Sequence, residues 1–199
     1  MLDNKKNKWL SIYDTIISRR SIRRFKQKPI KIEILKKLIN AARLAPSGAN
    51  LQVLEYFIVT DKILCSKIFD TIGWAGYIKP TWKPRKEERP TTYIIILTND
   101  INDRYYIRDV GIATENIVLT AESENVGSCI LCNIKRNKIR KFLRIPDNFH
   151  VDSVIALGYK AEQPVIEDMK DSVEYWRDEN DVLHVPKRRL KDIIHINKF

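Results

Sequence analysis

Residues 18 to 25, SRRSIRRF, carry the densest set of possible binding groups in the sequence. These eight positions hold four arginines and two serines, which suits a nucleic-acid backbone, a membrane surface or one small phosphate. Arg19, Ser21 and Arg23 fall at the expected end of a helix, where two guanidinium groups and a hydroxyl can converge on one oxyanion. A solvated basic turn explains the same residues, so this stretch alone does not decide between the interpretations.

A second candidate is LAPSGANLQ, residues 44 to 52, which follows an amphipathic helix. Its Ser47, Gly48, Asn50 and Gln52 offer backbone and side-chain groups to a planar polar ligand. An ordinary helix cap followed by a turn is the simpler explanation of the same residues.

The third candidate is the C-x-x-C pair Cys129 and Cys132. A redox-active pair of this kind should open a helix, but here apolar residues separate the cysteines and no helix start follows. A zinc site needs two further ligands, and neither the third cysteine nor the three scattered histidines has a standard spacing. We therefore expect two small apolar cysteines in a core-facing segment and no metal.

The elements that position these groups follow from hydrophobic periodicity. Helices are expected at 9–19, 34–42, 62–70, 105–125 and 136–144, and buried strands at 54–60, 93–98 and 153–159. Residues 127–134 form either a strand or a crossing loop, and residues 73–92 are expected to be mostly irregular. The tail from Pro164 is highly charged, but its apolar islands favour a position over a partner subunit. Helices mixed with few strands, without regular alternation, indicate an α+β fold.

Composition restricts the classes of function. The net charge is +11, but basic and acidic residues alternate along most of the 199 residues, which favours a solvated surface over a nucleic-acid stripe. The apolar runs are too short to cross a bilayer, so no membrane contact is expected. Three cysteines and the lack of a recognisable leader indicate reduced thiols in a single cytoplasmic domain.

The order of the segments is more specific than any one of them. Residues 18–61 contain an R-x-S-x-R turn, a helix ending in ARLAPS, then N-x-Q and a strand, and this order resembles the opening of the nitroreductase family of FMN-dependent oxidoreductases. Three later segments are similar to the family in sequence and order: DVGIATENIVLTAESENVGSCIL at 109–131, IPDNFHVDSVIALGYKAEQP at 145–164 and HVPKRRLKDIIHIN at 184–197. The resemblance covers nearly the whole chain.

The resemblance implies an architecture and a cofactor. The expected fold is an α+β sandwich, in which a mixed four-stranded sheet is wrapped by helices in an intertwined homodimer. Residues 1–199 would form one FMN-binding domain, with 165–199 as a C-terminal extension that is exchanged over the partner subunit. Each FMN would lie at the dimer interface and draw on both subunits.

The resemblance also implies roles for individual residues. One group would hold the FMN phosphate and ribityl chain: Arg19, Ser21 and Arg23. Arg20 would contribute backbone, and Arg24 is expected on the surface. A loop from the other subunit would pack near the isoalloxazine: Pro46, Ser47, Gly48 and Asn50. A strand segment would lie against the ring and present backbone N–H groups: Cys129, Ile130, Leu131 and Cys132. The C-terminal basic pair Lys187 and Arg188 would lie near the phosphate, and Arg189 replaces either if the register slips by one.

Two departures from the family pattern concern the flavin environment. Ile130 and Cys132 stand where the family often has Trp and Gly, and residues 73–90 replace a longer insertion that shapes the substrate pocket in many members. Trp74, Tyr77 and Trp82 in that region would either stack on a planar substrate or form a buried aromatic core.

The implied activity is a ping-pong transfer of electrons from NAD(P)H, through flavin N5, to an electron-poor small molecule such as a nitroaromatic or a quinone. No side chain is expected to be catalytic, because the chemistry takes place on the flavin. Two alternatives remain open at this point. One is a flavoenzyme of the same fold that carries out reductive dehalogenation or a ferredoxin-fed reduction, and the other is a flavin-binding or nucleic-acid-binding protein without turnover.

Overall fold

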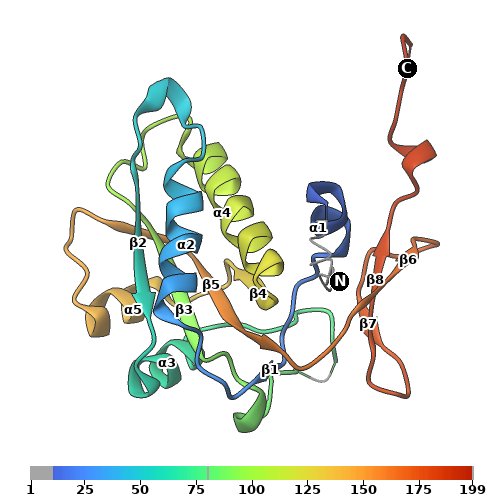
Figure 1. Cartoon of the computed structure of the whole chain (residues 1–199), viewed down its shortest axis with the longest axis horizontal. Helices are drawn as coiled ribbons and strands as arrows, with labels where there is room; N and C mark the ends of the chain where they lie inside the picture. Colours follow the sequence, from blue (N-terminus) through green and yellow to red (C-terminus); the bar gives the residue numbers. More distant parts are fainter. Residues whose placement is uncertain (1–10, 80, 199) are drawn as a thin grey trace, which may run out of the picture.

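A five-stranded sheet forms the centre of the computed structural model, which describes residues 11–79 and 81–198 (Figure 1). Its strands are β1 (Phe25–Lys26), β2 (Leu54–Val59), β3 (Thr92–Thr98), β4 (Val126–Leu131) and β5 (His150–Lys160). The long strand β5 pairs with β3, with β4 and, at its end, with β1, while β2 pairs with the other side of β3. All these pairings are antiparallel, and a parallel contact comes from the bridge between Ser21 and Ser128. The expectation of four strands running in mixed directions is therefore wrong, because the sheet has five strands and its strand pairs are antiparallel.

The central strand β3 is buried along its whole length because both faces of the sheet are covered. Its successive side chains point to opposite faces. Ile94 and Ile96 belong to one core cluster, whereas Tyr93, Ile95 and Leu97 belong to the other. This explains the continuous apolar run in its sequence.

Helices α2 (Ile32–Arg43) and α4 (Tyr106–Ser123) pack on each other and on one face of the sheet, while α3 (Lys62–Phe69) and α5 (Arg136–Leu143) belong to the other core cluster. Helix α4 contributes a buried stripe of small and branched residues, including Ala113, Ile117 and Ala121. Gly111 has open space on the side where a Cβ would lie. The expected helices and the α+β class are confirmed.

Helix α1 (Ile12–Ser18) starts with a capping box. The Asp14 N–H donates to Ser11 Oγ at 3.0 Å, and the Ser11 N–H donates to the Asp14 carboxylate at 3.2 Å. The helix expected at 9–19 is confirmed from Ile12, and its first residues, including Leu10, lie outside the described residues. The helix contacts α4, yet its apolar side chains are largely exposed in the single chain.

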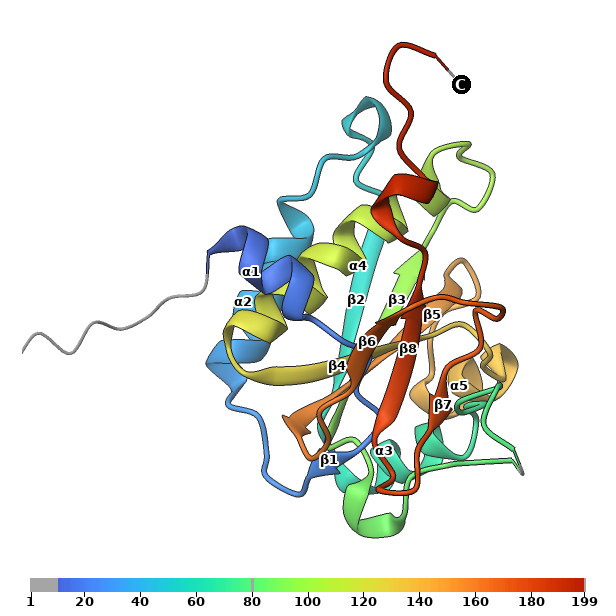
Figure 2. The same ribbon diagram turned by 90° about the vertical axis from the view of Figure 1, so that its right-hand side faces the viewer.

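The tail folds into a small sheet beside α1, away from α2 and α3 (Figures 1 and 2). Strand β8 (Leu183–Lys187) pairs in parallel with β6 (Val165–Asp168) and antiparallel with β7 (Trp176–Arg177), and the short helix η3 (Leu190–Asp192) follows. Among the described residues, the tail contributes Leu183 to the buried core. Residues 127–134 were expected to form either a strand or a loop. They form strand β4 up to Leu131 and leave the strand after it.

Residues 73–79 and 81–91 are irregular, as expected, apart from the short helix η2 (Lys86–Glu88), and β3 starts at Thr92. Trp74 is buried against Phe69, with their ring centroids 5.4 Å apart, and it belongs to the core. Tyr77 stays exposed, and the guanidinium groups of Arg24 and Arg177 lie 5.6 and 5.0 Å from the ring centroid of Trp82.

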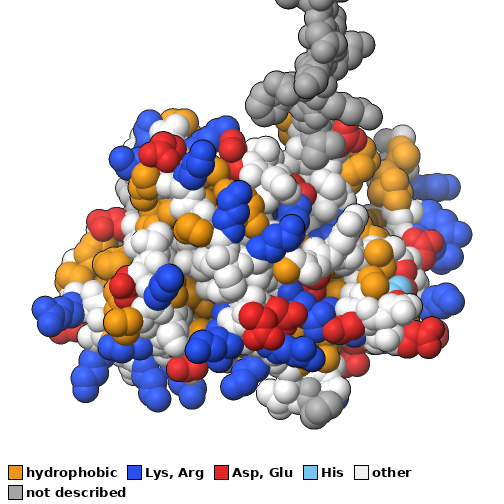
Figure 3. Space-filling view, turned by 60° about the horizontal axis from the view of Figure 1, so that its bottom comes forward, with side chains coloured by type: hydrophobic (Ala, Val, Ile, Leu, Met, Phe, Trp, Pro, Cys, Tyr) orange, Lys and Arg blue, Asp and Glu red, His pale blue; other side chains and the backbone are white. Residues whose placement is uncertain are grey.

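Lysine and arginine side chains are interspersed with aspartate and glutamate on the face shown in Figure 3, which is the bottom of the view in Figure 1. This agrees with the interpretation of the charge as a solvated surface. Within the described ranges, every helix is too short or too polar to cross a bilayer.

Candidate functional site

The arginine turn, residues 19–24, connects α1 to β1 and runs beside β4. The Ile22 N–H donates to the Ser128 carbonyl at 2.8 Å, and Ser21 forms a parallel bridge with Ser128. Ile22 is buried, and its side chain lies 3.0 Å from the position of a Cβ on Gly127, so that glycine allows the close approach. The structure therefore brings two of the candidate segments, SRRSIRRF and CILC, side by side.

The turn concentrates positive charge in a partly buried place. Burial, followed by the neighbouring charge of Arg19, lowers the pKa of Arg20. The Arg19 Nε is buried and has no hydrogen-bond partner among the described residues, although Glu115 lies 3.7 Å away as an ion pair. Adjacent cations that disfavour each other are stabilised by a bound anion.

Arg20 lines a different space from Arg19, Ser21 and Arg23. It lines a groove of about 910 Å³ together with Glu122 and Lys160, which pair with each other at 2.5 Å. Arg19, Ser21 and Arg23 do not line this groove. Such an arrangement is compatible with the expectation that Arg20 contributes backbone rather than its side chain.

Glu162, which was not among the predicted site residues, fixes the shape of the turn. One of its carboxylate oxygens accepts from the N–H groups of Arg23 at 2.5 Å and Arg24 at 3.2 Å. The other accepts from the Arg177 guanidinium at 2.6 Å, and both of these side chains are only 7% exposed. The signal was its place in the family-like segment LGYKAEQP, where it is the sole acidic residue.

Aromatic and acidic groups of the tail cover the turn. The Arg23 guanidinium lies 4.6 Å from the ring centroid of Tyr175, which packs edge-on against Tyr77. Arg24 forms an ion pair with Asp181 at 2.5 Å. The expectation that Arg24 lies only on the surface is wrong, because its side chain ties the turn to the tail.

The predicted basic pair of the tail makes its contacts elsewhere. The Arg188 guanidinium donates to the Asp192 carbonyl at 2.7 Å, and Arg189 pairs with the Asp192 carboxylate at 2.9 Å. Lys187 lies opposite Asp168 in the small sheet. Contacts between this pair and the arginine turn are missing from the described part of the single chain.

Strand β4 divides the four predicted ring-facing residues between two environments. Cys129 and Leu131 are buried, while Ile130 is 41% exposed and Cys132 is exposed. The expectation of two core cysteines is right for Cys129 and wrong for Cys132, because residues three apart in an extended segment point to opposite faces. Burial raises the pKa of the Cys129 thiol, although Arg23 and Arg19 act in the opposite direction. Within the described residues no cluster of His, Cys, Asp and Glu could hold a metal ion.

The loop with Pro46, Ser47, Gly48 and Asn50 is anchored to the start of α4. The Gly48 N–H donates to both carboxylate oxygens of Asp109, at 3.0 and 3.2 Å. A Cβ on Gly48 would lie 2.3 Å from the Tyr105 ring, so only glycine fits there. Ala49, Asn50 and Gln52 have positive φ, and the loop includes the short helix η1 (Gly48–Asn50). It is a specific backbone structure and not a simple helix cap.

The loop and the arginine turn occupy different positions along α4. The loop contacts Asp109. In the turn, Arg19 pairs with Glu115, and the charge of Glu122 acts on Arg20. At 1.5 Å per residue, Asp109 lies about 9 Å from Glu115 and about 20 Å from Glu122 along the helix axis. One chain therefore supplies the predicted site residues as separate groups.

Comparison with known proteins identifies the relatives of the chain. A family model described as "Nitroreductase family" matches residues 16–159. A protein of Archaeoglobus fulgidus named "Putative NADH dehydrogenase/NAD(P)H nitroreductase" is 30% identical over 156 residues, which are 74% of this chain and 84% of that protein. An iodotyrosine deiodinase of Thermotoga neapolitana is 24% identical over 165 residues, covering 74% of this chain and 88% of that protein. The solved structure of an FMN-dependent nitroreductase of Clostridium difficile R20291 superposes with a TM-score of 0.66 at 25% identity, covering 93% of this chain and 98% of that one.

Proposed function

The chain belongs to the nitroreductase family, and on this basis we propose that it binds FMN and passes electrons from NAD(P)H to a small electron-poor acceptor, a nitroaromatic or a quinone. When bound, FMN would supply hydride acceptance and donation at N5. The protein's own residues bind and orient the partners of this reaction.

The observation that carries the proposal is the arginine turn held against β4. Arg19, Ser21 and Arg23 come from a turn whose backbone is fixed by Ser128 and Glu162. The buried Arg19 Nε without a hydrogen-bond partner and the lowered pKa of Arg20 fit an anion bound there. We assign the FMN phosphate to these residues and the ring to the neighbouring segment 129–132.

The thiols near this place are not assigned a chemical step. Burial raises the pKa of Cys129, so at neutral pH it is a thiol rather than a nucleophilic thiolate. Backbone N–H groups of the 129–132 segment would instead act as fixed donors toward a ring that becomes negative on reduction.

We further propose that the protein acts as a homodimer, because one chain leaves the predicted groups apart. The loop at 46–50 and the pair Lys187 and Arg188 would then be contributed by the partner. Support comes from apolar side chains that the single chain leaves exposed on α1, on α4 and in the tail: Ile12, Tyr13, Ile16, Ile17, Ile107, Ile112, Leu190, Ile193 and Ile194.

The reaction is tested by anaerobic reduction of the FMN-loaded protein in a stopped-flow spectrometer. NADH or NADPH is expected to bleach the flavin absorption, and a nitroaromatic or a quinone mixed afterwards is expected to restore it. In steady-state assays, double-reciprocal plots at several acceptor concentrations should give parallel lines, as ping-pong kinetics require. Protein that binds FMN but is bleached by neither nicotinamide would contradict an NAD(P)H-dependent activity.

One second candidate is favoured by a specific relative. The iodotyrosine deiodinase of T. neapolitana matches most of this chain, so reductive dehalogenation is the alternative reaction of the same site. The acceptor series therefore includes iodotyrosine. Reoxidation with release of iodide, at a rate above that of the nitroaromatic and the quinone, would select this alternative.

A further inference from the structure

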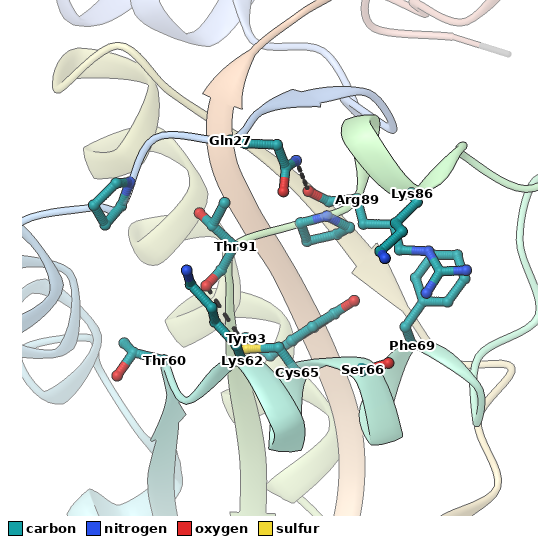
Figure 4. A pocket seen from close by; sticks show the side chains of 12 residues that line it. Gln27, Thr60, Lys62, Cys65, Ser66, Phe69, Lys86, Arg89, Thr91 and Tyr93 are labelled. Atoms are coloured by element: carbon teal, nitrogen blue, oxygen red, sulfur yellow. Dashed lines mark hydrogen bonds between the residues drawn. The ribbon is translucent and has the colours of Figure 1, made fainter.

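A second cavity lies between α3, η2 and the segments that flank β1 and β3 (Figure 4). Its volume is about 390 Å³, which is in the range of small-molecule sites. None of its lining residues is among those predicted to bind the flavin. The exposed apolar surface of α1 and of the tail lies on elements that do not line this cavity.

The charge of the lining has one sign. Lys62, Lys86 and Arg89 line the cavity, and the described residues that line it include no aspartate or glutamate. Two carboxylates next to lining residues in the sequence, Asp61 and Glu88, are engaged in other contacts. Asp61 accepts from the Leu64 N–H at 2.9 Å as the cap of α3, and Glu88 pairs with Arg24 at 3.5 Å.

Two buried polar groups of the lining lack partners. Tyr93 is 0% exposed, and its hydroxyl has no hydrogen-bond partner among the described residues. Figure 4 shows its side chain crossing the floor of the pocket from Cys65 toward Phe69 and Arg89. The Nε of Arg89 is likewise buried and unpaired. Buried polar groups are normally satisfied, so two unsatisfied donors beside one cavity point to a ligand that accepts from them.

The same lining offers an apolar surface that is already rigid. The Arg89 guanidinium stacks over the Phe69 ring with its central carbon 3.9 Å from the ring centroid. The Arg89 carbonyl accepts from the Gln27 side chain at 2.9 Å, which holds the segment in place. Pro29 and Pro90 complete the apolar lining.

We propose that this cavity binds a small organic anion, with a carboxylate or phosphate head and a planar apolar body. The head would accept from the Tyr93 hydroxyl and from Arg89, with Lys62 and Lys86 at the rim, and the body would lie along the Phe69 side. This site is separate from the flavin site and does not depend on the proposed redox function.

Titration of the full-length, FMN-loaded protein with benzoate, followed by amide NMR, tests the proposal. Benzoate is expected to shift amide signals of residues 60–69 and 86–93, whether or not it also perturbs the flavin spectrum by entering the flavin site. Benzamide, which has the same shape without the charge, is expected to bind at least about tenfold more weakly. Phenyl phosphate and inorganic phosphate distinguish the two head groups and the need for an apolar body.

Two exposed lysines of the same helix give a matched pair of variants. Lys62→Ala is expected to weaken benzoate binding several-fold, whereas Lys67→Ala, which removes an equal charge outside the pocket lining, should leave it unchanged. Arg89→Gln should abolish the shifts. Equal affinity for benzoate and benzamide, shifts confined to the flavin site, or equal effects of the two lysine variants would overturn the proposal.

Discussion

At the scale of single residues, the acidic group that organises the site matters as much as the arginines. Glu162 accepts hydrogen bonds from two backbone N–H groups of the arginine turn and from the buried guanidinium of Arg177. It thereby fixes the turn and connects it to the tail. An ion pair that is only 7% exposed on both sides has been desolvated, so loss of one partner leaves an uncompensated buried charge.

Glu162→Gln is therefore expected to lower the free energy of unfolding by about 3 kcal/mol, measured by urea denaturation at a fixed protein concentration. Glu174→Gln, in the exposed part of the tail, removes an equal charge and should change the value by less than about 0.5 kcal/mol. Equal effects of the two variants would show that the buried pair is not a stabilising contact.

The sequence indicated the arginine turn and the segment at 129–132, but not their mutual contact. Arginines and cysteines are visible as residue types, whereas the bridge between Ser21 and Ser128 depends on how two distant segments pair. The exposure of Cys132 was missed because both cysteines were assigned to the core, although residues three apart in an extended segment point to opposite faces. Arg24 was assigned to the surface because its partner Asp181 lies in the tail, far away in sequence.

At the scale of elements, α1 has a face that the chain does not cover. Its apolar side chains were correctly predicted to form a stripe at helical spacing, yet Ile12 is 82% exposed. A stripe of this kind on a helix next to the arginine turn fits burial against a second copy. Helix α4 agrees with this, since Gly111 opens onto space in one chain.

Ile12→Glu is expected to weaken self-association at least about tenfold, because it would bury an unpaired carboxylate in the proposed interface. The change should not disturb the helix itself, since residue 12 is its first position, where glutamate is favourable. Size-exclusion chromatography with light scattering would report a wild-type mass about twice 23.4 kDa and a shift toward the single-chain mass for the variant.

The matched control is Asn137→Glu on α5, which adds the same charge at another exposed helical position. It should keep the wild-type mass. A wild-type protein that runs as a single chain with FMN bound would contradict the proposed dimer.

At the scale of the whole molecule, the α+β class and nearly all helices were accessible from the sequence. Amphipathic periodicity marks α2, α4 and α5 clearly, because one side of each packs on the sheet. The direction and number of strands were not accessible, since short strands such as β1 carry almost no pattern and pairing is a long-range property. The small sheet of the tail was missed because charged residues separate its strands.

The central claim is that the arginine turn holds the phosphate of FMN, and one comparison of affinities tests it directly. Riboflavin lacks the phosphate, so the ratio of the riboflavin and FMN dissociation constants isolates the contribution of that group. We expect a ratio of at least about one hundred for the wild type, since each charged hydrogen bond contributes about 1.5–3 kcal/mol.

In the double variant Arg19→Ala with Arg23→Ala the ratio should fall close to one, while Lys36→Ala with Lys67→Ala, which removes the same charge from α2 and α3, should keep it. The dissociation constants are measured by quenching of flavin fluorescence in folded protein. A wild-type ratio retained by the arginine variant would place the phosphate elsewhere and would refute the assignment of this site.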